Sequence, residues 1–287
     1  MSGFSSDWLA LREPADHRAR RDALLDELPP PTEGRARRVV DLGTGTGSNL
    51  RYLMPRLGAQ QQWRLIDNDP ALLSELPSRL APWASAHGLN VQRDADHLRI
   101  DGARLSASVA TQALDLAGPL DELRLDEADL VSCSALLDLF SPERLGALAG
   151  AIARARCPVL FSLSYDGRVA WSPTLPFDAT ATALLNAHQR RDKGLGGSAG
   201  PDAGAMMVDA LREHGYRVIA EPADWQLSAA QAPLQRALID GWEQALREQQ
   251  PDQAEAVAEW HAERCALIDE GTGEIHVGHL DIVATPP

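Results

Sequence analysis

Three glycines separated by single residues stand in the stretch VVDLGTGTGSN. Gly43, Gly45 and Gly47 follow an apolar run that predicts a strand, and a helical pattern begins directly after them. Because glycine has no side chain, the backbone of such a turn can approach a ligand closely, beside the positive end of a helix. With Asp41 two positions before the first glycine, the stretch indicates a site for a nucleotide-like ligand.

The spacing of these glycines excludes two common phosphate-binding turns. A dinucleotide fingerprint needs glycine three positions after Gly45, and Ser48 stands there. A P-loop needs a Gly-Lys-Ser or Gly-Lys-Thr run, which does not follow. A nicotinamide-dependent oxidoreductase is therefore the less favoured alternative.

What remains, an acidic residue ahead of a GxGxG turn, resembles motif I of the class I S-adenosylmethionine-dependent methyltransferases. The resemblance runs with diminishing strength from about Val39 to Leu163. It implies that the glycines pack against the methionine part of S-adenosylmethionine. It also implies that an acid ending the second strand accepts hydrogen bonds from both ribose hydroxyls. In LIDND that acid is Asp67, with Asp69 as the alternative, and an ionised carboxylate suits the role because it only accepts.

Two further stretches extend the resemblance. QALDLAG is similar to the adenine contact of the family, so Asp115 would accept from the adenine amino group and Leu116 would offer its backbone. DLVSCSALLDLFS is similar to the segment after the fourth strand and lacks the Asn-Pro-Pro-Tyr signature of base and glutamine methylation, which disfavours those substrates. The residues implied for the cofactor are Asp41, Gly43, Thr44, Gly45, Gly47, Asp67, Asn68, Asp115, Leu116, Ser132 and, from an N-terminal helix closing over the site, Arg20.

Candidates for the methyl acceptor's side lie after the fifth predicted strand, where long connections tend to carry function. We expect a substrate lid between residues 164 and 200, with His188 as base or orienting group because its ordinary pKa of ~6.5 suits proton transfer. An alternative is that His188 is a packed or surface residue. Arg190 or Arg191 would clamp an anionic group of the substrate. The catalytic candidates are Tyr165, Asp166, His188, Arg190 and Arg191.

The elements that must position these residues alternate between strands and helices. This order predicts an α/β fold: a Rossmann-like, doubly wound sheet of seven strands, the last antiparallel, with helices on both faces. We expect one methyltransferase domain over 1–287. Its parts are an N-terminal helical cap (1–31), a cofactor-binding core (37–163), the lid (164–200) and a C-terminal part with a two-helix insertion (201–287). A small hairpin is expected between Leu89 and Leu116.

The composition of the chain restricts the kinds of partner that it is expected to bind. The chain of 287 residues has a formal net charge of -14, which disfavours nucleic acid. No apolar run approaches a bilayer span and no secretory signal stands at the N-terminus, so we expect a cytoplasmic protein that does not bind membranes. Three cysteines without a CxxC pair argue against a disulfide framework and against a zinc site, so no metal is expected.

These features together predict transfer of a methyl group from S-adenosylmethionine to a small molecule. HQRRDKG is similar to a stretch of uncharacterised bacterial methyltransferase-like sequences, which supplies no substrate. A non-catalytic module that binds the adenosyl cofactor is the second alternative. The acceptor atom and the choice between monomer and homodimer stay open.

Overall fold

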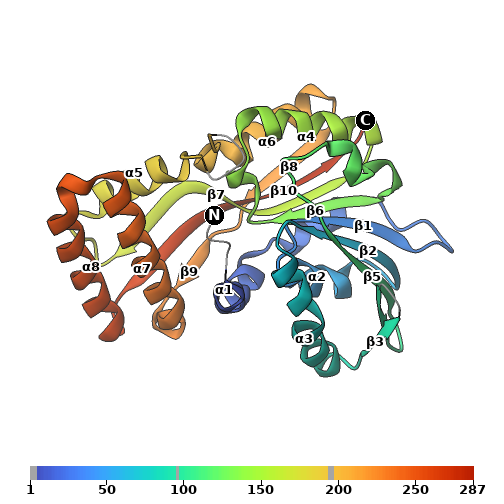
Figure 1. The fold of residues 1–287 in the computed structure, drawn as a ribbon, viewed down its shortest axis with the longest axis horizontal. Helices are drawn as coiled ribbons and strands as arrows, with labels where there is room; N and C mark the ends of the chain where they lie inside the picture. Colours follow the sequence, from blue (N-terminus) through green and yellow to red (C-terminus); the bar gives the residue numbers. More distant parts are fainter. Residues whose placement is uncertain (1–4, 95–96, 193–196) are drawn as a thin grey trace.

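The fold was obtained as a computed structural model, which describes residues 5–94, 97–192 and 197–287 (Figure 1). Its helices are α1 Ser6–Ala19, α2 Ser48–Leu53, α3 Pro70–Ala86, α4 Pro142–Ala155, α5 Asp178–Gln189, α6 Ala203–Glu213, α7 Ala232–Gln249 and α8 Ala254–Asp269. Its strands are β1 Arg37–Leu42, β2 Gln60–Asp67, β3 Asn90–Asp94, β4 His97–Asp101, β5 Ser106–Ala113, β6 Leu130–Ser134, β7 Val159–Ser172, β8 Arg217–Pro222, β9 Trp225–Leu227 and β10 Glu274–Thr285.

The strands form one sheet in the order β3-β4-β5-β2-β1-β6-β7-β10-β8, with β9 paired to β10. Strands β5, β2, β1, β6 and β7 run parallel, and β10 is antiparallel to both β7 and β8. The expected seven-stranded sheet with an antiparallel last strand is therefore confirmed as the central run from β5 to β8. The β3–β4 hairpin adds to one edge, within the stretch where a hairpin was expected.

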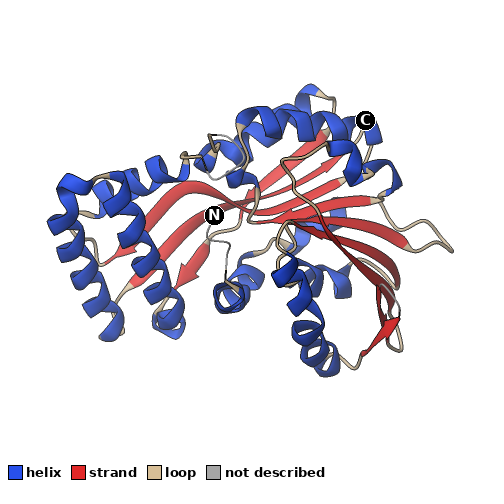
Figure 2. Cartoon of the chain, in the orientation of Figure 1, coloured by secondary structure: helices blue, strands red, loops and turns tan. Residues whose placement is uncertain are grey.

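Helices cover both faces of the sheet, as expected for a doubly wound α/β fold. In Figures 1 and 2, α4 and α6 lie over one face and α1, α2 and α3 over the other, while α5, α7 and α8 gather at the far end of the long strands β7 and β10. One apolar core joins α4 and α6 to the sheet, a second joins α2 and α3 to the opposite face, and a third holds the α5, α7 and α8 end.

Helix boundaries follow local chemistry. The Ser141 hydroxyl accepts the Arg144 N–H at the start of α4, and Asp69 accepts the Ala71 N–H at the start of α3. Both helices begin at a proline, Pro142 and Pro70, whose missing N–H costs nothing in the first turn. Each helix buries one apolar face, α3 through Leu72, Leu76 and Leu80 and α4 through Leu145, Leu148 and Ile152.

Strand β7 continues nine residues beyond the expected end at Leu163. The chain bulges there, with Leu163 at a φ of 55°, and then pairs with β10 as far as Ser172. Sequence patterning missed this extension because Gly167 and the mixed polar residues around it are typical of a loop, whereas pairing with the long final strand β10 holds them extended. The helix expected after it is present as α5.

Among the described residues, no helix is long and apolar enough to cross a membrane.

Candidate functional site

The glycine turn joins β1 to α2 with all three glycines in the left-handed region, at φ values of 62° for Gly43, 54° for Gly45 and 83° for Gly47. Side-chain-bearing residues adopt such angles at a cost of about 1–2 kcal/mol each. The Thr44 N–H donates to the Ile66 carbonyl of β2 at 3.0 Å, which fastens the turn to the neighbouring strand. The backbone conformation itself therefore requires glycine here.

Apolar side chains of the protein lie close against the turn. A Cβ added to Gly43 would meet Leu136 at 2.7 Å, one at Gly45 would meet Leu9 of α1 at 2.9 Å, and one at Gly47 would meet Leu76 of α3 at 2.3 Å. The absence of side chains at these glycines thus allows three leucine side chains to pack directly against the backbone of the turn. Helix α1 covers the turn at Gly45.

Asp67, at the carboxyl end of β2, reaches back to the glycine turn. Its Oδ2 accepts the Gly45 N–H at 2.7 Å and its Oδ1 accepts the Asp69 N–H at 3.0 Å. Each carboxylate oxygen keeps capacity for a further hydrogen bond. Asp69 by contrast caps α3, which gives it a structural duty that Asp67 lacks.

A buried polar network lies beneath the turn, between β1, β6 and α2. Asp41 Oδ1 accepts from Asn49 Nδ2 at 2.5 Å and from the Ser132 hydroxyl at 2.7 Å. Asn49 Oδ1 in turn accepts from Arg20 Nη1 at 2.9 Å, and Arg20 Nε lies 3.5 Å from Asp281 Oδ2 of β10. Residues from five elements meet here, including Arg20 from the end of the α1 segment.

Two buried oxygens of this network, Asp41 Oδ2 and Thr44 Oγ1, lack a well-aligned hydrogen bond to the described residues, although the Thr44 hydroxyl lies close enough to Asp41 to interact with it. Unpaired buried polar atoms are costly, at roughly 1–3 kcal/mol each, and often mark functional sites. Burial raises the pKa of Asp41, while hydrogen bonds from Ser132, Asn49 and Thr44 work against that rise. A bound group carrying hydrogen-bond donors would meet acceptor oxygens of Asp41 and Thr44 here, so the residues present fit a polar ligand at this turn.

Two contacts fasten α1 over the turn and α2, and a third joins α2 to the turn. Arg51 Nε donates to Glu13 Oε1 at 2.7 Å, and the Arg51 guanidinium also donates to the Thr46 carbonyl at 2.7 Å. His17 Nε2 lies 3.1 Å from the Ser48 hydroxyl. The cover over the site is therefore polar at its margins and apolar at Leu9.

The remaining cofactor candidates lie at the rim. Asp115 is exposed after β5, where its Oδ1 accepts the Ala117 N–H at 2.9 Å, and Leu116 is buried. Asn68 is exposed beside Asp67. All three stand at the carboxyl edge of the parallel strands.

The acceptor-side candidates divide between interior and surface. Tyr165 is buried on β7, and its hydroxyl donates to Asn186 Oδ1 at 2.8 Å; burial raises its pKa. Asp166 pairs with Arg168, which also binds Asp224.

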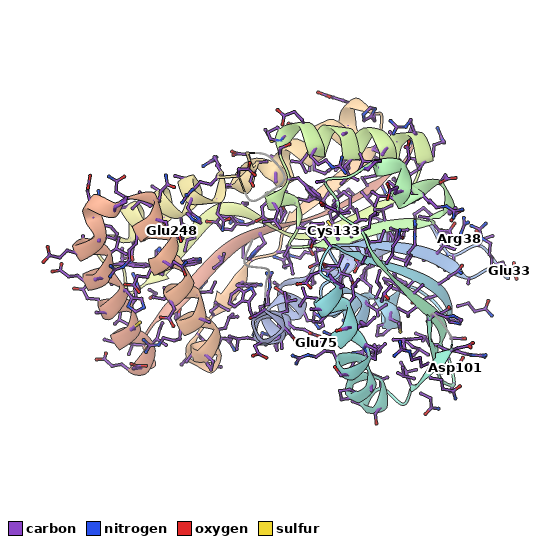
Figure 3. All side chains as sticks on the ribbon, viewed as in Figure 1. Glu33, Arg38, Glu75, Asp101, Cys133 and Glu248 are labelled. Atoms are coloured by element: carbon purple, nitrogen blue, oxygen red, sulfur yellow. The ribbon has the colours of Figure 1, made fainter. Side chains whose placement is uncertain are left out.

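The other three candidates take part in exposed ion pairs. His188 Nε2 lies 3.2 Å from Glu248 Oε2 of α7, and Arg191 approaches the same carboxylate at 3.5 Å. Arg190 binds Asp202 at 2.9 Å. Figure 3 labels Glu248 at the α7 end of the molecule and Cys133, next to Ser132, at the centre of the sheet. The sequence neighbour Lys193 lies outside the described residues.

Sequence reasoning missed Asn49, Asp281 and His279. Asp281 Oδ1 accepts the Leu163 N–H at 2.8 Å at the β7 bulge, and Oδ2 accepts the Arg21 N–H at 3.1 Å. His279 faces Tyr165 across the β7–β10 ladder and is buried with its Nδ1 unpaired. The available signal was polar residues at alternate positions in the otherwise apolar final strand, which places them on one face of the sheet.

No protein family and no curated protein matches the sequence in the comparisons made. Among solved structures, the chain is similar to the cyclopropane synthase MmaA2 from Mycobacterium tuberculosis, at 12% identity and a TM-score of 0.48 over 98% of this chain and 95% of that one. The mycolic acid cyclopropane synthase CmaA1, complexed with SAH and CTAB, matches at 13% identity and 0.48 over 98% and 94%.

A third similar structure is an SAM-dependent methyltransferase from Thiobacillus denitrificans in complex with S-adenosyl-L-homocysteine. It matches at 16% identity and a TM-score of 0.40 over 98% of this chain and 92% of that one. Likenesses this weak do not decide what the chain binds. That must follow from the site, where a glycine turn, an acid at the end of β2 and a buried Asp41 network meet at one edge of the sheet.

Proposed function

We propose that the chain binds S-adenosylmethionine at the Gly43–Gly47 turn and transfers its methyl group to a small molecule. The supporting observation is the turn's place in the sheet. Strand β1 is flanked by β2 on one side and β6 on the other, so the strand order reverses at β1. Open α/β sheets bind ligands in the crevice outside the carboxyl ends of the strands at this switch point. The names of the similar structures, two of which were solved with the demethylated cofactor, agree with this proposal.

Asp67 suits the ribose of an adenosyl group in this proposal. Its carboxylate is fixed by two backbone N–H groups, one at each oxygen, and each oxygen has room for one more donor. Two ribose hydroxyls would fill these positions, and the negative charge would repel a 2′-phosphate. Asp115 and Leu116 at the neighbouring strand end are the proposed adenine contacts.

The Asp41 network suits the methionine end of the cofactor. We assign Asp41 Oδ2 and the Thr44 hydroxyl to its ammonium group, and the Arg20 guanidinium to its carboxylate. Charge-assisted hydrogen bonds of this kind are stronger than neutral ones. When bound, S-adenosylmethionine would supply a methyl group on a positively charged sulfur.

Leu9 must give way for a ligand to lie against Gly45, because it now packs there. We therefore propose that α1 shifts when the cofactor binds. Its contacts to Arg51 and Ser48 are hydrogen bonds that can re-form in a second position. The shift would also screen the bound cofactor from water.

Methyl transfer is an in-line displacement, so the protein has to hold the acceptor about 3–3.5 Å from the methyl carbon and need not form a covalent bond. We place the acceptor between the end of β6 and the β7 bulge at Leu163, where Tyr165 is the interior candidate for orienting it. Asp166, Arg190 and Arg191 stay proposals for recognising substrate charge. His188 stays the proposed base.

Calorimetric titration with S-adenosylhomocysteine and, separately, NADH tests the proposal. We expect S-adenosylhomocysteine alone to bind, and Asp67→Ala to weaken its binding more than tenfold because two hydroxyl donors lose their acceptor. Asp69→Ala is the matched control: it removes a helix cap worth ~1 kcal/mol of stability and should leave affinity within about threefold.

Two results would count against parts of this function. Binding of NADH alone would favour the oxidoreductase alternative. Cofactor binding without transfer of labelled methyl to any component of a cell extract would favour the non-catalytic module.

A further inference from the structure

A histidine, a cysteine and two carboxylates converge on the seam between α7 and α8, remote from the glycine turn. His261 Nε2 lies 2.8 Å from Asp240 Oδ1 and 3.5 Å from Cys265 Sγ. Glu243 Oε2 lies 3.7 Å from the same nitrogen. Ligand atoms of Asp240, His261 and Cys265 all lie within 4.8 Å of one another, the one such group among the residues that the structure describes.

The helical hairpin explains why these side chains meet. His261 and Cys265 are four residues apart on α8, and Asp240 and Glu243 are three apart on α7, so each pair shares one helix face. Residues 250–253 join the two helices in a short turn, and the helices pack against each other with these faces together (Figure 1). The cluster is thus carried by two regular elements rather than by loops.

Glu243 accepts from Arg247 Nε at 3.0 Å through its Oε1, which leaves Oε2 facing His261. One proton on His261 Nε2 can serve one of the three acceptors around it, whereas one cation bound between them would serve all three and the nitrogen as well. Exposed ion pairs between histidine and a carboxylate contribute ~0–1 kcal/mol. His261 is half-buried and Cys265 is buried, so this cluster is less exposed to water than an ordinary surface ion pair.

We propose that this cluster is a site for a divalent zinc ion, with Asp240, His261 and Cys265 as ligands and Glu243 as the fourth. A thiolate beside an imidazole selects a borderline-soft metal over Mg²⁺ or Ca²⁺, which prefer oxygen ligands. Zinc bonds of about 2.0–2.3 Å in a tetrahedron put neighbouring ligand atoms roughly 3.3–3.7 Å apart. The separations of 3.5 and 3.7 Å match these lengths, and the histidine–aspartate pair has to open by less than 1 Å. Because Cys265 Sγ also lies 3.9 Å from Nδ1, the imidazole ring has to turn for the Nε2 lone pair to face the metal.

The charges around the cluster agree with a cation there. Two carboxylates and a thiolate would more than neutralise Zn²⁺. Burial raises the pKa of Cys265, and the nearby Arg236 guanidinium partly offsets this rise. Arg236 donates to the Cys265 carbonyl at 3.2 Å and to Asp269, and its hydrogen bond to the Cys265 side chain would have to break when the metal binds. Metal binding releases the thiol proton.

The site would clamp the α7–α8 hairpin at the end of the molecule where α5 also packs. Asp178 at the start of α5 accepts from Trp260 Nε1 of α8 at 2.9 Å and from Arg264 Nε at 3.1 Å, so α8 positions α5. The proposal departs from the expectation of no metal, which considered cysteine pairs alone. It is independent of the methyl-transfer proposal.

Cobalt titration of the full chain, freed of metal with a chelator, tests the site. Co²⁺ takes zinc's place in tetrahedral sites and reports a sulfur ligand through a sulfur-to-cobalt charge-transfer band. We expect one equivalent to bind with that band and with the visible bands of tetrahedral Co²⁺, and one equivalent of Zn²⁺ to remove both. Zn²⁺ should also raise the melting temperature.

Three variants make the assignment specific. Cys265→Ser should lose the sulfur band, and Asp240→Asn, an exposed change that leaves the fold intact, should weaken Co²⁺ binding at least tenfold. His214→Ala, at an exposed histidine ending α6, is the control and should bind as the parent does. A spectrum without the sulfur band, or equal affinity in Asp240→Asn and the parent, would overturn the proposal, and the Asp240 result decides if Cys265→Ser does not fold.

Discussion

Two regions of this molecule are rich in polar residues, and they are built differently. At the glycine turn, Asp41, Asn49, Ser132 and Arg20 come from separated segments, are buried, and share a hydrogen-bond network. On the 186–192 segment the polar residues are neighbours in sequence and make exposed ion pairs, such as Arg190 with Asp202. The buried network formed because residues from separate segments meet in the fold. A high density of polar residues in one stretch of sequence formed only surface pairs.

Burial explains why this difference matters for function. Exposed charges are screened by water and salt, and their pairs contribute ~0–1 kcal/mol. Buried groups act at a lower effective dielectric, so each hydrogen bond to the buried Asp41 carboxylate carries more weight than a surface pair. Substitutions in the two regions should therefore differ in their effects on cofactor binding and stability.

Replacing Gly45 by valine should have the largest effect. The residue has a φ of 54°, and a Cβ there would meet Leu9 at 2.9 Å, so both backbone strain and crowding oppose it. We expect a loss of roughly 2–4 kcal/mol of stability and of more than 100-fold in S-adenosylhomocysteine affinity, measured by denaturant unfolding and calorimetry. Gly88→Ala is the control, because Gly88 has a φ of 68° with open space around it. It should cost about 1 kcal/mol and leave affinity unchanged.

The pH dependence of stability should report the buried His279. Burial lowers its pKa to about 3, below the ~6.5 of the unfolded chain. Between these values the unfolded chain binds more protons, so the free energy of unfolding falls as pH drops from about 6.5 towards 3. From pH 7 to 4.5 this group should account for roughly 2–3 kcal/mol. His279→Phe should abolish that part of the slope, whereas His276→Ala, at an exposed position of the same strand, should not. Equal slopes in His279→Phe and the parent would contradict the burial of a neutral histidine.

Shortening Leu9 should improve cofactor binding, since the ligand no longer has to displace it from Gly45. Loss of about 1 kcal/mol of apolar contact corresponds to roughly fivefold tighter binding. Leu11→Ala, which packs on the α5, α7 and α8 core instead, serves as the matched control. Weaker binding in Leu9→Ala would mean that α1 does not compete with the ligand.

His188→Ala should have the smallest effect on cofactor affinity, less than twofold, because His188 pairs with Glu248 at the surface. If His188 is the base, turnover with methyl-labelled cofactor is lost while affinity holds. Normal turnover would remove it from that role.

The sequence predicted the fold well where local signals and tertiary structure agree. The cap and proline at Ser141 and Pro142 marked the start of α4, and alternating elements predicted the parallel sheet. The sequence did not predict the extension of β7 past Leu163, because this segment is a strand through its pairing with β10, more than 100 residues away. Local patterns carry no information about such a partner.

The candidate site was predicted in part for the same reason. Motif I identified the glycine turn, and Asp67 does reach it through the Gly45 N–H. Asn49 and Asp281 carry no motif, since their importance comes from contacts across the fold. Nor could the sequence indicate that Leu9 lies against Gly45.

A crystal structure of the chain with S-adenosylhomocysteine would show whether the glycine turn holds the cofactor. We expect the nucleoside at the Gly43–Gly47 turn, its ribose on Asp67, and Leu9 moved away from Gly45. A ligand bound elsewhere, or a saturating soak that leaves Leu9 packed on Gly45, would contradict this expectation.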